Sequence, residues 1–166
     1  MVRYVTILFK EGELLAAGVA GGKSRVFDFR GKPVEQSLRR LKVALGAGPW
    51  MVYDLWEVLD LNASGLLTGV DVSRFGPQTT PLVQPLYIGA RLTQHVMRKP
   101  TMGALAAFLR CPWEGEVIDE PAEWTKFKPE AMRRQVELRL KTLAWLHERT
   151  APYMEYGLKL RAEGLY

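Results

Sequence analysis

The chain has few of the residues that most directly indicate a function. It contains one cysteine, Cys111, in 166 residues, so neither an internal disulfide nor a cysteine-cluster zinc site can form within it. No apolar run approaches the roughly 20 residues that cross a bilayer. Lys10 and Glu11 interrupt the first apolar segment, so no signal peptide is expected. We therefore expect a cytoplasmic protein without a membrane partner.

The composition predicts one globular domain. Asparagine occurs once and serine is scarce, while arginine, leucine, glutamate and proline are abundant, which favours a heat-adapted source. With 48% hydrophobic and 25% charged residues, we expect a single domain over 1–166, with a sheet core over 1–75 and a mainly helical part over 86–166 that covers the sheet. The net charge of +5 allows a polyanionic partner such as nucleic acid without requiring one.

The hydrophobic pattern predicts an α/β protein, because strand-like segments come first and alternate with helical periodicity further on. The predicted strands cover residues 2–9, 14–20, 25–29, 50–53 and 68–72. The predicted helices cover residues 33–45, 55–61, 86–97, 101–109 and 129–149. Residues 74–85 contain three prolines and predict a loop. Pro152 is expected to end the longest helix, and a shorter segment to Glu163 to add a last one.

The order of these segments resembles the RNase H-like fold, in which three antiparallel strands are followed by alternating helices and strands. Residues 33–45 and 50–54 resemble the first helix and fourth strand of the RNase H superfamily. Residues 52–59, with Ser64-Gly65, and residues 101–106 are similar to motifs of proofreading-type exonucleases in the same superfamily. The resemblance covers about residues 1–125 and implies an RNase H-like mixed sheet with C-terminal helices.

The resemblance also implies a site for Mg²⁺ or Mn²⁺. In the family, an acid early in the first helix and an aspartate at the end of the fourth strand help to hold two ions; here these are Glu35 and Asp54, with Asp119 or Glu123 as further ligands. Two such ions, roughly 3.5–4 Å apart, activate water and neutralise the leaving oxygen. Each acid also has a structural interpretation: Glu35 as a first-turn charge, Asp54 as a helix cap, and residues 119–123 as a solvated acidic loop.

The first predicted strand departs from the family pattern because it contains no acid. Thr6 and Leu8 lie where the family's first-strand aspartate is expected, and Glu11 and Glu13 fall in the turn beyond. Loss of one ligand usually removes most of the activity of a metal site. The favoured hypothesis is a catalytically silent RNase H-like domain that binds nucleic acid or a protein partner in a nucleic-acid-processing assembly. The alternative is a divalent-metal-dependent nuclease.

Basic residues in the C-terminal half are the candidates for nucleic-acid contact. They are Arg98 and Lys99, and on the long helix Arg133, Arg134, Arg139 and Lys141. Three aromatic residues between or near them, Trp124, Phe127 and Trp145, could stack on bases. The alternative is a solvated helix face over core tryptophans, since three glutamates on the same helix dilute its positive charge.

Overall fold

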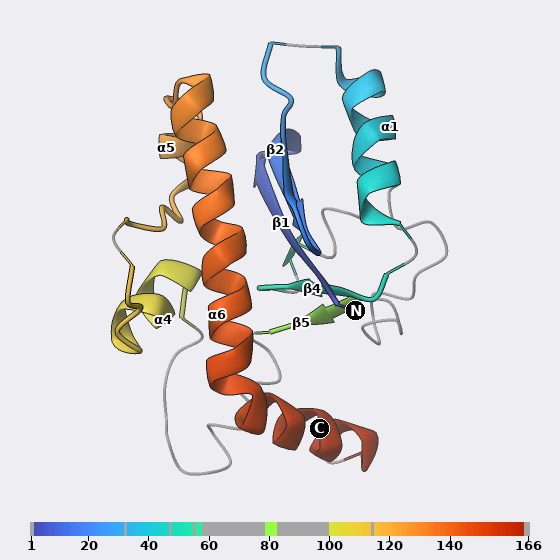
Figure 1. The fold of residues 1–166 in the computed structure, drawn as a ribbon, viewed down its shortest axis with the longest axis vertical. Helices are drawn as coiled ribbons and strands as arrows, with labels where there is room; N and C mark the ends of the chain where they lie inside the picture. Colours follow the sequence, from blue (N-terminus) through green and yellow to red (C-terminus); the bar gives the residue numbers. More distant parts are fainter. Residues whose placement is uncertain are drawn as a thin grey trace.

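The protein is described from a computed structural model, which covers residues 2–31, 33–46, 48–54, 56–57, 79–82, 100–113 and 115–164. Figure 1 shows strands near the middle of the molecule with helices on either side. The strands are β1 (Arg3–Lys10), β2 (Glu13–Ala20), β3 (Ser24–Asp28), β4 (Trp50–Val52) and β5 (Thr79–Pro81). The helices are α1 (Val34–Leu45), α4 (Met102–Phe108), α5 (Pro121–Trp124) and α6 (Pro129–Ala162).

The strands form one mixed sheet in the order β3-β2-β1-β4-β5. β1 pairs antiparallel with β2, with Ile7 opposite Ala17, and β2 pairs antiparallel with β3. β4 pairs parallel with β1, and β5 pairs parallel with β4. A parallel pair needs a long crossover connection, and α1 provides it between β3 and β4. The predicted α/β class is therefore confirmed.

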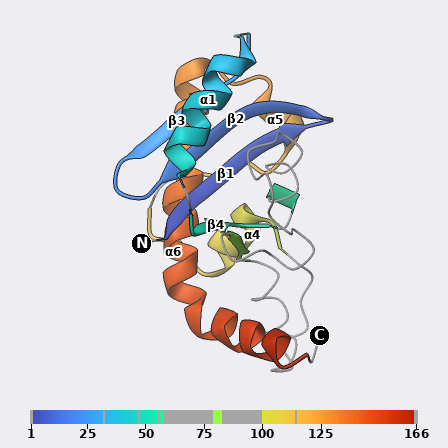
Figure 2. The same ribbon diagram turned by 90° about the vertical axis from the view of Figure 1, so that its right-hand side faces the viewer.

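Helices α1 and α6 cover opposite faces of the sheet, and both Figure 1 and Figure 2 show this arrangement. Side chains alternate between the two faces along a strand. Val5 and Ile7 of β1 pack in one cluster with Leu41 of α1. Leu8, on the other face, packs with Val136 of α6. Thr6 shares the α6 face with Leu8 by the same alternation, and this places a hydroxyl beneath that helix.

One strand, one short helix and one helix end differ from the predictions; the short helix is α5, at residues 121–124, where the sequence predicted no helix. β5 lies within residues 74–85, where the sequence predicted a loop. It has three residues and ends at Pro81, which a strand at the sheet edge can accommodate, so it gives too little periodicity to be recognised. The predicted strand over 68–72, the predicted helix over 86–97 and most of the predicted helix over 55–61 lie outside the described residues.

Helix α6 continues through Pro152, and the prediction that it ends there is wrong. Proline has no N–H and its ring displaces the carbonyl four residues earlier, but a helix can bend at a proline instead of ending there. Figures 1 and 2 show α6 bending sharply toward its C-terminal end. Thr150 donates a hydrogen bond to the Leu146 carbonyl at 2.6 Å, a contact that also favours bending.

Within the described segments, no helix is both long enough and apolar enough to cross a membrane. The longest, α6, has 34 residues and carries charged side chains from its first turn onward.

Close contact between β2 and α6 depends on Gly18. A Cβ built on Gly18 would overlap Val136 Cγ1 and lie 2.8 Å from Leu140 Cδ1. Valine in a helix is almost fixed in one rotamer, so its methyl group cannot easily move away. Glycine at this position therefore allows α6 to approach the sheet closely enough to cover Thr6.

We predict that Gly18→Ala lowers the free energy of unfolding by about 1–3 kcal/mol, because the added methyl group overpacks the contact with α6. Urea denaturation measures the change. The control is the same substitution in a Val136→Ala background, where the methyl group has room and the loss should be clearly smaller. An equal loss in the two backgrounds would contradict this explanation.

Candidate functional site

A buried glutamate, Glu57, lies at the centre of the candidate site. It follows β4 and is only 7% exposed. Its Oε1 accepts hydrogen bonds from the Thr6 hydroxyl at 3.2 Å and the Ile7 N–H at 3.1 Å. Its Oε2 accepts from the N–H groups of Tyr53 at 2.8 Å and Asp54 at 3.2 Å. Glu57 thus joins the middle of β1 to the end of β4, and each of its oxygens has two donors.

Asp54 and Glu57 form a capping box at the start of a helical turn. Asp54 Oδ1 accepts a hydrogen bond from the Trp56 N–H at 3.2 Å, while the Glu57 carboxylate bonds back to the Asp54 N–H. An aspartate followed three residues later by a glutamate is a sequence signature of this arrangement. Asp54 therefore makes the capping contact that the sequence offered as its structural interpretation. Glu57 was missed as a site residue, although this spacing could have indicated it.

Helix α6 brings a second buried charge, Arg139, to the same place. Arg139 is 5% exposed, so it departs from the solvated helix face that the sequence suggested. Its Nε donates to Thr6 Oγ1 at 3.1 Å, and its Nη1 donates to the Ile118 carbonyl at 3.1 Å. The guanidinium carbon also lies 5.5 Å from the centre of the Trp124 ring, within the range of a cation–π contact. The Thr6 hydroxyl therefore connects a buried anion to a buried cation.

Asp119 pairs with this arginine. Its Oδ1 lies 3.3 Å from Arg139 Nη1, and its Oδ2 accepts a hydrogen bond from the Gly103 N–H at 3.0 Å. A Cβ on Gly103 would lie 2.7 Å from Asp119 Oδ2 and 2.6 Å from the Val117 carbonyl oxygen, so only glycine fits here without a shift. We call the four side chains of Thr6, Glu57, Asp119 and Arg139 the buried polar network.

Burial shifts the ionisation of the groups in and around this network. Burial raises the pKa of Glu57 above its usual value, while the Arg139 charge and the backbone N–H donors lower it in part. Burial also raises the pKa of Tyr53 well above its usual value, and the negative charge of Asp119 adds to the effect. The Tyr53 hydroxyl is therefore a neutral donor, and it bonds to the Pro100 carbonyl at 2.7 Å.

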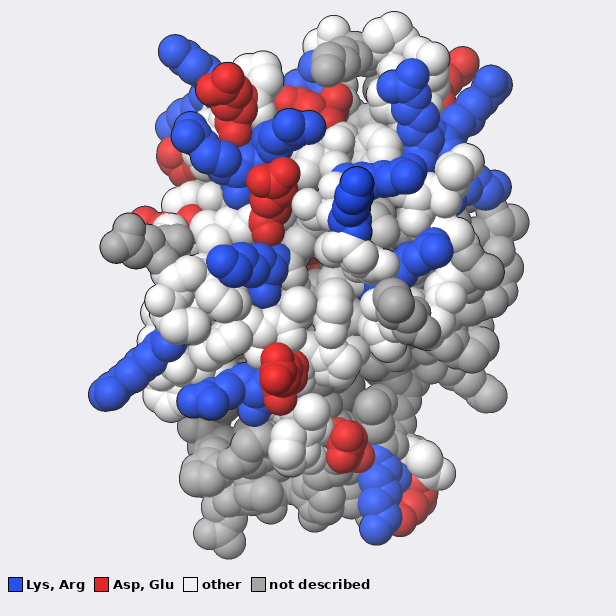
Figure 3. Space-filling view, viewed as in Figure 1, with Lys and Arg blue, Asp and Glu red and all other residues white. Residues whose placement is uncertain are grey.

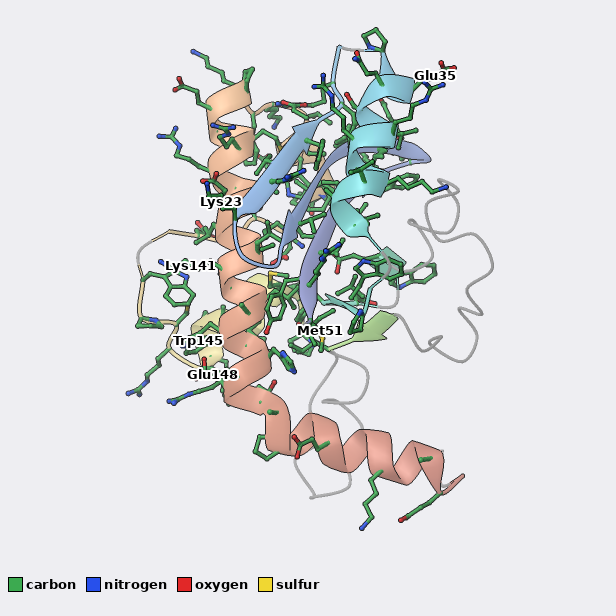
Figure 4. The ribbon with its side chains drawn as sticks, turned by 45° about the vertical axis from the view of Figure 1, so that its right-hand side comes forward. Lys23, Glu35, Met51, Lys141, Trp145 and Glu148 are labelled. Atoms are coloured by element: carbon green, nitrogen blue, oxygen red, sulfur yellow. The ribbon has the colours of Figure 1, made fainter. Side chains whose placement is uncertain are left out.

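The four acids that the sequence proposed for a metal site have different surroundings. Glu35 is exposed in the first turn of α1, on the opposite side of the sheet from α6; Figure 4 labels it near one end of that helix. Glu123 is exposed and pairs with Lys126 at 3.1 Å. The negative charges of Asp54 and Asp119 both raise the pKa of the buried Tyr53 hydroxyl. Among the described residues, no group of three histidine, cysteine or acidic side chains is placed to hold a metal ion.

The donor set of the buried polar network does not fit a pair of divalent cations. Both oxygens of Glu57 already accept hydrogen bonds from protein donors, and both oxygens of Asp119 do so as well. The Arg139 guanidinium supplies a positive charge between them, and this charge repels a second cation. No metal-dependent step follows from these residues.

The basic residues predicted to contact nucleic acid are only partly described. Arg133, Arg134 and Lys141 are exposed on α6. Arg98 and Lys99 lie outside the described residues. Figure 3 shows basic and acidic side chains mixed over α6, so this helix face is not strongly positive by itself.

The aromatic residues near this helix are mostly structural. Trp124 is 6% exposed and donates its Nε1–H to the Ile118 carbonyl at 2.8 Å. Trp145 makes an edge-to-face contact with Trp113, with ring centres 5.8 Å apart. Lys141, labelled with Trp145 in Figure 4, lies 4.4 Å from the centre of the Trp113 ring. The interpretation of Trp124 as a core residue is confirmed.

Comparison with known proteins gives no relative: no protein-family model matches the chain, and no curated protein or solved structure matches it significantly. Its function is therefore inferred from the geometry of the described residues.

We predict that Arg139→Ala lowers the free energy of unfolding by about 3–5 kcal/mol, because it leaves buried carboxylates without their cation. Urea denaturation followed by tryptophan fluorescence measures the loss. Arg134→Ala, an exposed arginine on the same helix, is the matched control and should change stability by less than about 0.5 kcal/mol. Equal losses of unfolding free energy in the two variants would show that the buried polar network contributes little to stability.

Proposed function

We propose that the chain is an RNase H-like domain that binds nucleic acid and has no nuclease activity. The order of elements supports the fold assignment: three antiparallel strands are followed by a helix that leads to a strand parallel to the first. This is the arrangement that the resemblance of residues 33–45 and 50–54 implies. The mixed sheet and its two helical layers are consistent with it.

The 3.1 Å hydrogen bond from Arg139 Nε to Thr6 Oγ1 is the main support for a lack of nuclease activity. Where a nuclease of this family has a first-strand acid that helps to hold a metal ion, this chain has a hydroxyl that bonds a guanidinium. A metal ion lowers the pKa of a bound water and so creates the nucleophile. A guanidinium cannot do this, because it has no open coordination position and does not exchange protons near neutral pH.

Nucleic acid is favoured over a protein partner by the charge of the chain. The net charge is +5, and exposed basic residues occur on both helical layers, including Arg39 and Arg40 on α1 and Arg133 on α6. Such a surface attracts the phosphate backbone without requiring a particular base sequence. Trp56, which is 65% exposed beside Asp54, adds an aromatic ring on which a base could stack.

We predict binding without cleavage when the purified protein is mixed with labelled single- and double-stranded DNA and RNA in Mg²⁺ or Mn²⁺. Fluorescence anisotropy should show a dissociation constant on the order of 10⁻⁶–10⁻⁴ M that rises with salt. Gel electrophoresis of the same samples should show intact strands.

Asp54→Ala separates a true activity from a contaminating nuclease. Cleavage by the wild type that disappears in Asp54→Ala would support the nuclease alternative and contradict our proposal. Cleavage that is equal in both proteins would come from a contaminating nuclease. The assay repeated with further purified protein would then show whether the chain itself cleaves nucleic acid. Absence of binding to all four substrates would exclude nucleic acid as the partner.

A further inference from the structure

A basic groove runs along β3, an edge strand of the sheet, between α1 and α6. It has a volume of about 500 Å³ and is lined by residues of all three elements. Four arginines contribute to it: Arg25 from β3, Arg39 and Arg40 from α1, and Arg133 from α6. All four are exposed. We call this feature the edge groove; Figure 3 shows basic side chains on both helices that flank it.

The charge of the edge groove is nearly all of one sign. Glu137 is the one acid in its lining. Within the part of the chain that the structure describes, none of the four arginines forms an ion pair or a side-chain hydrogen bond. Arg30, by contrast, is neutralised by Asp28 at 2.7 Å. Four guanidinium groups are thus available to an anion from outside the chain.

The basic lining continues beyond the edge groove. A second hollow of about 290 Å³ shares Arg25 and Val43 with it and adds Lys23. Lys23 lies in the turn before β3 and is labelled in Figure 4. The five residues of β3 span roughly 17 Å, since each strand residue rises by about 3.3 Å. This elongated shape fits a linear polyanion better than a single phosphate group.

The apolar part of the lining favours a single strand over a duplex. Val43 is 76% exposed, and Val26 and Phe27 of β3 are partly buried in the same groove. A single strand can place its bases on apolar side chains and on guanidinium planes, while arginine forks bind its phosphates. A duplex exposes phosphates, sugars and base edges, but its base faces are stacked inside and cannot lie on these side chains.

We propose that the edge groove is a binding site for single-stranded nucleic acid, with its four arginines on the phosphodiester backbone. This inference rests on the proposed nucleic-acid binding and gives it a location. Binding takes place at the β3 edge, and the exposed α6 residues Arg134 and Lys141, which the sequence nominated, are not required. The buried polar network has only a structural part in binding.

The test uses fluorescence anisotropy of a labelled thymidine oligonucleotide of about 20 residues, with the full chain and its variants. The groove variant is Arg25→Ala/Arg40→Ala/Arg133→Ala. The control, Lys128→Ala/Arg134→Ala/Lys141→Ala, removes an equal number of positive charges from exposed positions on α6 and immediately before it. All six positions are exposed, so both variants should fold, which circular dichroism checks.

We expect the dissociation constant of the groove variant to rise at least about tenfold, and the slope of its logarithm against log salt to fall by about 2, at roughly 0.7 per phosphate contact. The control should stay within about threefold of the wild type. Equal weakening in the two variants would overturn the edge groove while leaving nucleic-acid binding intact. No binding by the wild type would overturn both proposals.

Two further probes examine the chemistry of the occupant. A DNA duplex of the same length should bind more weakly than the single strand. Polyglutamate of similar charge should compete poorly, because it has no bases to contact Val43 and Phe27. Tighter binding of either probe than of the single strand would contradict the assignment and favour, respectively, a duplex or an acidic protein segment.

Discussion

The buried pairing of Glu57 with Arg139 through Thr6 is the constraint on which the rest of the structure depends. A charge beneath a helix is strongly unfavourable unless it is paired and hydrogen-bonded. Here the glutamate has four donors, and the arginine has a hydroxyl, a carbonyl and a carboxylate as acceptors. These bonds form only if α6 crosses the sheet at one position, above the middle of β1. Gly18 permits that approach, and Gly103 permits the approach of Asp119 to α4.

The same pairing sets what this face of the sheet can do. A guanidinium is a permanent cation with a fixed fork of donors, and it has no exchangeable ligand position. With carboxylate oxygens already bonded to protein donors, the α6 face is better suited to holding the fold together than to activating water. We therefore place the proposed function on the outer surface, where the arginines of the edge groove lie on and beside β3, in keeping with the rule that a fold alone does not define an activity.

Periodicity and spacing in the sequence predicted the first four strands, α1 and α4, because these segments have clear apolar patterns. They missed β5, since three residues ending in proline have no pattern, and they ended α6 at Pro152, where the helix bends and continues. The acid at position 57 was signalled by its spacing from Asp54. Arg139 follows Val136 by three residues and precedes Leu143 by four, so it lies on the buried stripe of α6; its charge nevertheless suggested a solvated position. Which partner neutralises a charge depends on tertiary contacts that sequence spacing does not contain.

We infer that Glu57 and Asp119, held by protein donors and by Arg139, do not bind a divalent metal ion, and paramagnetic broadening by Mn²⁺ tests this most directly. In a ¹⁵N-labelled sample, the backbone N–H groups of Ile7, Tyr53 and Gly103 report on the carboxylates of Glu57 and Asp119, to which they are bonded. We expect millimolar Mn²⁺ to broaden these three signals no more than those of N–H groups far from any acid. Selective broadening of all three at low Mn²⁺ would contradict it, because a metal ion would then bind where the guanidinium lies.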